Sequence, residues 1–358
     1  MLKDEGTLVL IVGQEFSDSI EIDAGSEVWA VRFTPNSEYL VTRGWGWIRV
    51  WRVKDGKQVA MMKADGAWGV AVSKDGRFIA AGSQREVLVW DATTHEQVFA
   101  GHNGVPICDV DFSPNSTRLI SADSLNNTAT IWDVAARKGV RTLNHSWPVL
   151  ASKYSPQGDR IATVTSDESV GVWDSDDGRL LVNVKGGLSP FRGLLWFNNY
   201  LFVKTKVSTI KKIDASTGST ISEWSVPRER DSRIALPQHG QFLAYSIKDN
   251  ITFWDTSTHI QLGLVSRSSS VCSITFSPSG QRLAFVQDGN IIIKNLSRVK
   301  VRRLVNRFPF LILISYQGAG HPYWKSCARG VEKRSTRQCG SITDCSTLDV
   351  RGYSPYTR

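Results

Sequence analysis

The 358-residue chain has 41% hydrophobic and 22% charged residues, which excludes gross disorder, and its longest apolar run, Phe308 to Ile314, is too short for the roughly 20 residues of a membrane helix. Its net charge of +9 arises after residue 297, where 12 basic residues face 3 acidic ones, so the main body is electrically balanced. Five scattered cysteines exclude a disulfide scaffold and favour a cytoplasmic or nuclear protein.

A β-branched or aromatic residue followed by Trp, and often by Asp, recurs along the chain. The tryptophans of this couplet are Trp51, Trp90, Trp132, Trp173 and Trp254. Their spacings are 39, 42, 41 and 81 residues, and Lys212-Ile213-Asp214 fills the double gap. The period near forty predicts seven units, which are residues 24–63, 64–103, 104–144, 145–185, 186–226, 227–266 and 267–306.

A second marker lies about eighteen residues before each couplet. It is an apolar residue followed by a turn, as in Phe33-Thr34-Pro35 and Phe112-Ser113-Pro114. Within each unit, four β-rich runs are separated by turn residues, which predicts a small four-stranded antiparallel sheet. Such sheets are apolar on both faces and must stack. The sequence therefore predicts an all-β propeller of seven blades, spanning residues 1–306.

The period, the Trp-Asp ending and scattered Gly-His pairs resemble the WD-repeat family over residues 24 to about 305. The resemblance implies a hydrogen-bonded set in each blade, formed by a His, a Ser or Thr of the second strand, an Asp of the following turn, and the Trp. The residues that match are His145, Thr163, Asp167 and Trp173 in full, and His102, Ser121 and Trp132 with Asn126 in the turn.

The resemblance also implies that the last blade takes its outer strand from the N-terminal region. Ser19 to Asp23 is the natural candidate, although Ser297 to Val305 competes for the same position. An eighth blade, shared between Leu8 to Asp23 and Phe308 to Tyr316, is the alternative to seven. The chain could also be a piece of a longer repeat array.

Residues 307–358 form a basic tail with few large aliphatic side chains, and we expect it to be disordered. Its Cys327, Cys339 and Cys345 are spaced by 12 and 6 residues and lack the close pairs of zinc sites, so no metal is expected. The chain also has no phosphate-binding loop and no nucleophile elbow. Asp109 and Asp111, on a predicted first strand, are expected to be paired or solvated. These patterns predict a protein that is not an enzyme and needs no cofactor.

In WD-repeat proteins the turns between second and third strands, and the loops leading into first strands, share one face, where partners usually bind. Aromatic and Arg side chains dominate interface hot spots. The predicted partner-binding residues on this face are Arg43, Trp45, Trp47, Arg85, Trp147, Phe191, Arg192, Arg230 and Arg267. Trp45 lies between two glycines in a turn and is the strongest candidate, whereas Trp68 aligns with Trp29 on the first strands and is expected to pack in the core.

The sequence thus predicts a monomeric, non-catalytic scaffold that binds a peptide or protein partner. The alternative function is association with nucleic acid or an anionic surface through the basic segment Arg298 to Arg337. The identity of the partner does not follow from the sequence.

Overall fold

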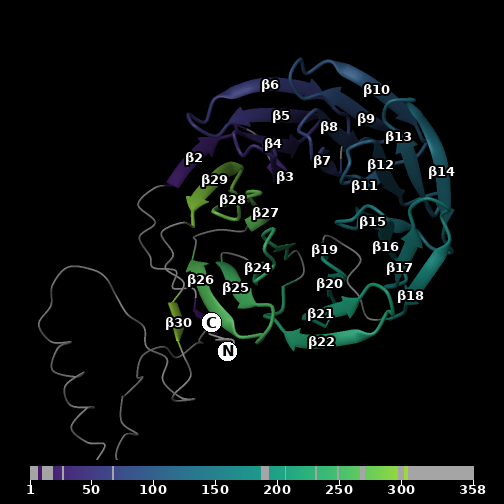
Figure 1. The fold of residues 1–358 in the computed structure, drawn as a ribbon. Coiled ribbons are helices and arrows are strands. Elements are labelled where there is room, and N and C mark those ends of the chain that lie inside the picture. Colours follow the sequence, from purple (N-terminus) through teal and green to yellow (C-terminus); the bar gives the residue numbers. More distant parts are fainter. Residues whose placement is uncertain are drawn as a thin grey trace, which may run out of the picture. The chain divides into compact units, whose positions relative to one another are not determined.

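The computed structural model describes residues 7–9, 19–25, 28–66, 68–186, 193–205, 207–229, 232–247, 250–266, 271–296 and 302–304. The chain divides into two units, Met1–Arg307 and Phe308–Arg358. The first unit contains seven four-stranded antiparallel sheets arranged as a ring (Figure 1). The predicted all-β fold is therefore confirmed, with seven blades rather than eight. The predicted disorder of the tail concerns residues outside those described.

Each blade runs from a first strand at the centre of the ring to a fourth strand at its rim. The strands of blades 1 to 3 are β3 (Val28–Phe33), β4 (Tyr39–Gly44), β5 (Trp47–Arg52), β6 (Gln58–Lys63); β7 (Val70–Val72), β8 (Phe78–Gly82), β9 (Glu86–Asp91), β10 (Gln97–His102); and β11 (Ile107–Phe112), β12 (Arg118–Asp123), β13 (Thr128–Asp133), β14 (Lys138–Asn144). Those of blades 4 to 6 are β15 (Val149–Tyr154), β16 (Arg160–Thr165), β17 (Val170–Asp174), β18 (Leu180–Val184); β19 (Leu194–Phe197), β20 (Tyr200–Lys204), β21 (Thr209–Asp214), β22 (Thr220–Ser225); and β23 (Ile234–Ala235), β24 (Phe242–Ile247), β25 (Asn250–Asp255), β26 (Gln261–Ser266).

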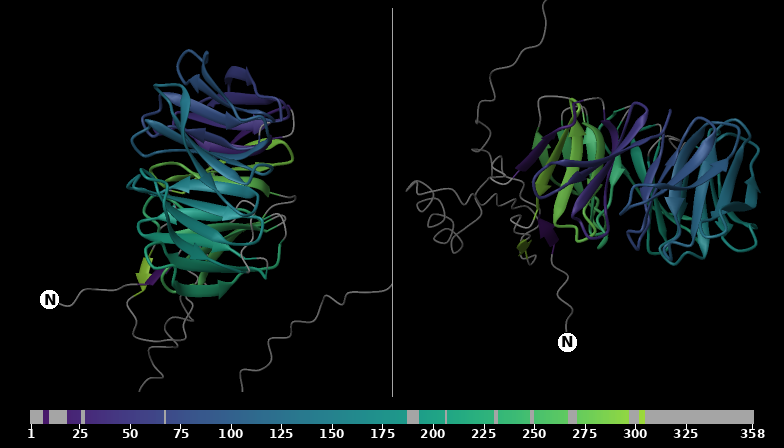
Figure 2. Two further views of the ribbon diagram at one scale, coloured as in Figure 1. Left: turned by 90° about the vertical axis from the view of Figure 1, so that its right-hand side faces the viewer. Right: turned by 90° about the horizontal axis from the view of Figure 1, so that it is seen from above.

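Blade 7 joins the two ends of the repeat region. It contains β27 (Val271–Phe276), β28 (Arg282–Gln287), β29 (Asn290–Asn295) and, as its outer strand, β2 (Ser19–Asp23). In the register of this closure Ser19 lies opposite Lys294, and Asp23 opposite Asn290. The competing C-terminal segment instead contributes β30 (Arg302–Leu304) to a two-stranded sheet with β1 (Thr7–Val9). The N-terminal candidate is thus the strand that closes the ring, which Figure 2 shows from two further directions.

The two sequence markers each supply a turn with its hydrogen bonds. In the first turn of blade 3, the Ser113 hydroxyl accepts a bond of 2.9 Å from the backbone N–H of Arg118. After the third strand of blade 4, the Asp174 carboxylate accepts bonds of 2.8 and 3.0 Å from the backbone N–H groups of Asp176 and Asp177. Short polar side chains recur at these positions because they satisfy backbone donors that the strands leave unpaired.

The core lies between neighbouring blades, where their apolar faces meet. One cluster combines Val89 of blade 2 with Leu119 and Trp132 of blade 3, all of them buried. The indole of Trp132 also donates a bond of 2.8 Å to the Ser121 hydroxyl, and Trp51 makes the same bond to Thr42. Each of these tryptophans therefore fills the space between blades while its one polar atom is satisfied.

Blade 4 contains a continuous chain of side-chain hydrogen bonds. His145 Nδ1 donates to the Leu143 carbonyl at 3.0 Å, and its Nε2 accepts from the Thr163 hydroxyl at 2.9 Å. The Thr163 oxygen in turn accepts from the Trp173 indole at 2.8 Å. Burial lowers the pKa of His145, which keeps the ring neutral as this arrangement requires.

Three residues assigned to these sets depart from the expectation. Asp167 binds the hydroxyls of Thr165 and Ser169 at 2.5 Å within its own turn, rather than the histidine. His102 is exposed, with its Nδ1 3.7 Å from the Glu86 carboxylate, and does not reach Ser121. Asn126 is also exposed. Its backbone N–H donates 2.8 Å to Asp123, the buried carboxylate that organises this turn.

Candidate functional site

The turns between second and third strands and the loops entering the first strands are hydrogen-bonded to one another. Ala64, in the loop that leads to blade 2, donates its N–H to Gly46 in the turn of blade 1 at 2.9 Å. Asn103, in the loop that leads to blade 3, donates to Arg85 in the turn of blade 2 at 2.8 Å. Both sets of loops therefore lie on one face of the ring, which we call the top face.

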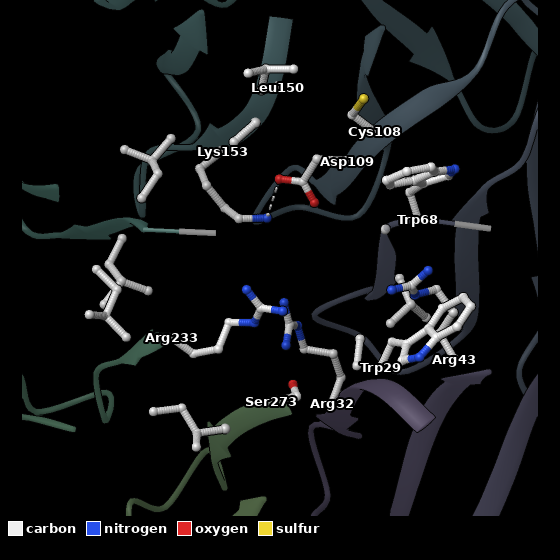
Figure 3. A pocket seen from close by; sticks show the side chains of 18 residues that line it. Trp29, Arg32, Arg43, Trp68, Cys108, Asp109, Leu150, Lys153, Arg233 and Ser273 are labelled. Atoms are coloured by element: carbon white, nitrogen blue, oxygen red, sulfur yellow. Dashed lines mark ion pairs between the residues drawn. The ribbon is translucent and has the colours of Figure 1, made fainter. Parts of the chain in front are cut away.

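A cavity of about 160 Å³ lies where the first strands surround the centre of the ring. Its lining includes residues from all seven blades, in or directly beside their first strands. The side chains that enter it are aromatic and basic on several sides (Figure 3). The cavity is thus a common meeting point for residues that lie far apart in the sequence.

Three tryptophans form a cluster beside this cavity. Trp29 and Trp68 line it, and Trp45 packs edge-on against Trp29 with ring centroids 5.2 Å apart. Trp45 is 76% exposed and Trp68 is 53% exposed. Large apolar surface that remains accessible in this way is typical of contact sites. We call Trp29, Trp45 and Trp68 the tryptophan cluster.

Arg43 is placed differently from the expectation for an exposed partner-binding residue. Its side chain is buried, with only 3% of the residue exposed, and its guanidinium lies 5.0 Å from the centroid of the Trp29 ring. A cation over an indole face is attracted by the ring electrons. Arg43 therefore packs against the face of the Trp29 ring and contributes little exposed surface of its own.

Trp68 was expected in the core, and the structure shows why this expectation was wrong. The register of four first strands shifts at one residue, and the shifts lie between Val28 and Ala30, Ile107 and Asp109, Val149 and Ala151, and Val271 and Ser273. A bulged residue is left unpaired and its side chain is re-aimed. Trp29 is such a residue, and Trp68 precedes β7 at the equivalent place. Both face the cavity instead of a neighbouring blade.

The other predicted partner-binding residues lie around the top face or outside the described residues. Trp47 and Trp147 are 37% and 53% exposed, and Arg85 is exposed in the turn of blade 2. None of these three lines the cavity. Phe191, Arg192, Arg230 and Arg267 lie outside the described residues. So does the basic segment of the alternative function, apart from β30.

The acidic pair on the first strand of blade 3 is engaged by a lysine of blade 4. Lys153 Nζ lies 3.3 Å from Asp109 and 3.6 Å from Asp111, so of the two expected states, paired or solvated, the structure shows the paired one. Burial alone would lower the pKa of Lys153, but the two carboxylates outweigh it and raise that pKa. Burial raises the pKa of Asp111. Asp109 and Asp111 also accept bonds from the backbone of Ser152 and Tyr154, so this cluster ties two blades together.

Neither a metal site nor a membrane segment is found in the part of the chain that the structure describes. No three or more His, Cys, Asp or Glu side chains are grouped there so as to hold a metal ion. No helix among those residues has the length and apolar character that crossing a membrane requires.

Comparison with known proteins finds one matching family model and several relatives that are similar to part of the chain. The family model described as "WD domain, G-beta repeat" matches four stretches, residues 19–52, 56–91, 93–133 and 137–174. Periodic tryptophan protein 2 of Arabidopsis thaliana is 29% identical over 44% of this chain and 18% of its own length. Pre-mRNA-splicing factor cwf17 of Schizosaccharomyces pombe is 25% identical over 42% of this chain and 46% of its own length.

Nuclear distribution protein nudF of Emericella nidulans is 26% identical over 46% of this chain and 43% of its own length. The chain thus spans less than half the length of each of these relatives. The matched repeats coincide with blades 1 to 4 and with β2, and blades 5 to 7 repeat the same four-stranded sheet. Together the matched stretches and the ring show that the chain carries WD repeats and folds as a seven-bladed β-propeller.

Proposed function

We propose that the chain is a non-catalytic interaction scaffold that binds a protein or peptide partner on its top face, at the tryptophan cluster. WD-repeat propellers are generally scaffolds that bind proteins, which supports the class of function. The observation that supports the location is the exposure of Trp45 and Trp68, 76% and 53%, beside the cavity. A partner that covers these rings removes a large apolar area from water.

The cluster is also suited to tight binding because it is held in place before a partner arrives. Trp45 packs against Trp29, and Trp29 packs over Arg43. Side chains that are already ordered lose little conformational entropy on binding. The thiols Cys108 and Cys272, which form no disulfide, fit a reducing compartment, and we propose that the chain acts in the cytoplasm or the nucleus as a monomeric propeller.

Capture of partners from nuclease-treated lysate of the source cells tests this proposal. The bait proteins are the tagged chain, the double variant Trp45→Ala/Trp68→Ala, and a matched control, Ile221→Ala. Ile221 is 54% exposed on the outer strand β22, so the control removes exposed apolar surface away from the top face. All three replaced side chains are exposed, and we expect melting temperatures to change little.

We expect mass spectrometry to identify proteins that the control retains and the double variant loses. The affinity of such a partner should fall by at least about tenfold in the double variant, since truncation of a hot-spot Trp costs about 2 kcal/mol or more. Equal retention by the double variant and the control would place the interface elsewhere on the ring.

The same experiment distinguishes the alternative function. A chain that ends after Val305 lacks most of the basic segment. Binding that is lost only in this truncated chain, and that falls steeply with salt, would assign the interaction to the basic segment and to an anionic partner. Binding at the tryptophan cluster should survive both the truncation and the salt.

A further inference from the structure

Two guanidinium groups meet in the central cavity. Arg32 lies in β3 of blade 1, and Arg233 directly precedes β23 of blade 6. Both line the cavity, and their side chains extend toward one another from opposite sides of it (Figure 3). Both residues are half-buried. Two like charges are thus held close together in a partly enclosed space.

Backbone carbonyls hold these arginines without neutralising them. Arg32 Nη1 donates to the Val31 carbonyl at 2.9 Å, and Arg233 Nε donates to the Cys272 carbonyl at 2.9 Å. Among the residues that the structure describes, no carboxylate forms an ion pair with either guanidinium. A guanidinium has five N–H donors, so most donors of both groups remain available.

The nearby acidic groups are already engaged. The cavity lining contains four basic side chains, Arg32, Arg43, Lys153 and Arg233, and one acidic side chain, Asp109. Lys153 is paired with Asp109 and with Asp111, and no carboxylate of the described residues pairs with the guanidinium groups of Arg32 and Arg233. Repulsion between uncompensated charges in a confined site is relieved when an anion of matching charge enters.

We propose that the central cavity binds a phosphate group between Arg32 and Arg233. A phosphate monoester carries a charge of about −1.5 to −2 near pH 7, which matches the charge of the two guanidinium groups. Its oxygens suit the forked donors of guanidinium groups, which bind phosphate through paired N–H bonds. The cavity of about 160 Å³ is roomy for such a group, because a water molecule needs only roughly 10–15 Å³. This site goes beyond the proposed function and does not depend on the tryptophan cluster.

Isothermal titration calorimetry of the full chain with inorganic phosphate, at constant ionic strength in chloride buffer, tests the site. The variants are Arg32→Gln and Arg233→Gln, and the matched control is Arg179→Gln, which removes an exposed charge from a turn of blade 4. We expect wild type to bind with a Kd of about 1 mM or tighter. Each cavity variant should bind at least about tenfold more weakly, and the control should differ by less than about twofold.

Thermal unfolding separates lost binding from lost folding. Without phosphate, each cavity variant should melt at or above the wild-type temperature, because one of two repelling charges is gone. Phosphate should raise the melting temperature of wild type and of Arg179→Gln, but not of the cavity variants. Equal stabilisation of wild type and both cavity variants by about 20 mM phosphate would overturn the proposal.

Two ligand arms identify the source of the phosphate group. One arm is inorganic phosphate, and the other is a short peptide with one phosphoserine, compared with its unphosphorylated form. Tighter binding of the phosphopeptide, weakened by Arg32→Gln and by Trp45→Ala, would assign the group to a partner that also contacts the top face. Equal or tighter binding of inorganic phosphate would assign a free ligand. Both results support a phosphate site, whereas a phosphopeptide that binds no better than its unphosphorylated form, together with no phosphate binding, overturns it.

Discussion

Blades 3 and 4 make the same indole bond within different surroundings. The Trp132 indole donates to Ser121, and the Trp173 indole donates to Thr163, both at 2.8 Å. In blade 4 the His145 ring lies on Trp173, with centroids 4.6 Å apart. The comparison shows that the bond from Trp to hydroxyl is the shared element, and that the histidine is an addition to it.

Beside Trp132 of blade 3, the histidine's place is taken by Phe99 from the outer strand β10 of blade 2. Its ring packs on Trp132 with centroids 5.7 Å apart, and Gly101 lies directly against the same indole. His102, the next residue, therefore points outward and is exposed. The Gly101-His102 pair matches the family pattern in sequence, yet His102 lies outside the contact between neighbouring blades. His145 follows an asparagine instead of a glycine, and it lies inside the corresponding contact.

Removal of either indole should produce the largest effect. Trp132→Ala and Trp173→Ala each delete a buried ring and leave a hydroxyl without its donor, so we expect about 3–5 kcal/mol of destabilisation in both. Denaturant unfolding at an unchanged m-value measures this. If Trp132→Ala destabilised the protein by less than half as much as Trp173→Ala, the Phe99 ring would hold its indole less strongly than the His145 ring holds Trp173.

Gly101→Ala, on the outer strand β10 of blade 2, should disturb the packing of that strand on Trp132 of blade 3. A Cβ atom at Gly101 would lie 2.6 Å from the Trp132 ring, so the indole must move, at a cost of about 1–3 kcal/mol. Gly139→Ala is the matched control, because a Cβ there meets its nearest atom at 3.5 Å in ordinary contact. Equal melting temperatures for the two variants would contradict the tight packing of Gly101 on Trp132.

The two histidines should respond differently to alanine. His145→Ala removes the ring that bonds to Thr163 and packs on Trp173, and we expect about 1–2 kcal/mol of destabilisation. His102→Ala removes an exposed ring and should change stability by less than about 0.5 kcal/mol. Similar losses of stability in both variants would show that His102 also packs between neighbouring blades.

The smallest expected effect is a dependence of stability on pH. Burial lowers the pKa of His145 from its ordinary value of 6.5, so the unfolded chain takes up a proton more readily than the folded chain. Stability from this neutral ring is complete above pH 6.5 and is lost as pH falls toward the lowered pKa. Thermal melting across this range should fall less steeply in His145→Ala than in wild type, while His102→Ala should follow wild type.

The sequence predicted the parts of the fold that one repeat contains. The two markers located the turns, because Ser113 and Asp174 satisfy backbone donors a few residues away. The same period predicted seven blades, and the resemblance to WD-repeat proteins made Ser19–Asp23 the natural candidate for the closing strand, with Ser297 to Val305 as its competitor. Interactions between residues that lie within about five positions of each other recur in every repeat, and they could therefore be predicted from the sequence.

The candidate site was harder to predict because it is assembled from several blades. Alignment placed Trp29 and Trp68 on first strands, but did not show that these strands face a cavity. It marked Arg43 as a surface residue, although the Trp29 ring covers it. The approach of Arg32 to Arg233 joins blades 1 and 6, and no periodicity within a repeat connects them. For these residues the position along the chain could be predicted from the sequence, but the direction in which each side chain points could not.

Closure of the ring by β2 has a consequence for the order of events during synthesis. Ser19 leaves the ribosome long before Lys294, the residue it faces in blade 7. Until that residue emerges, β2 presents an open strand edge and the growing stack of blades presents an uncovered apolar face, and both can associate with other chains. The last pairing also has the longest sequence separation in the ring, which makes it the slow step of folding. A nascent chain of this protein should therefore depend on chaperones most just before its seventh blade is complete.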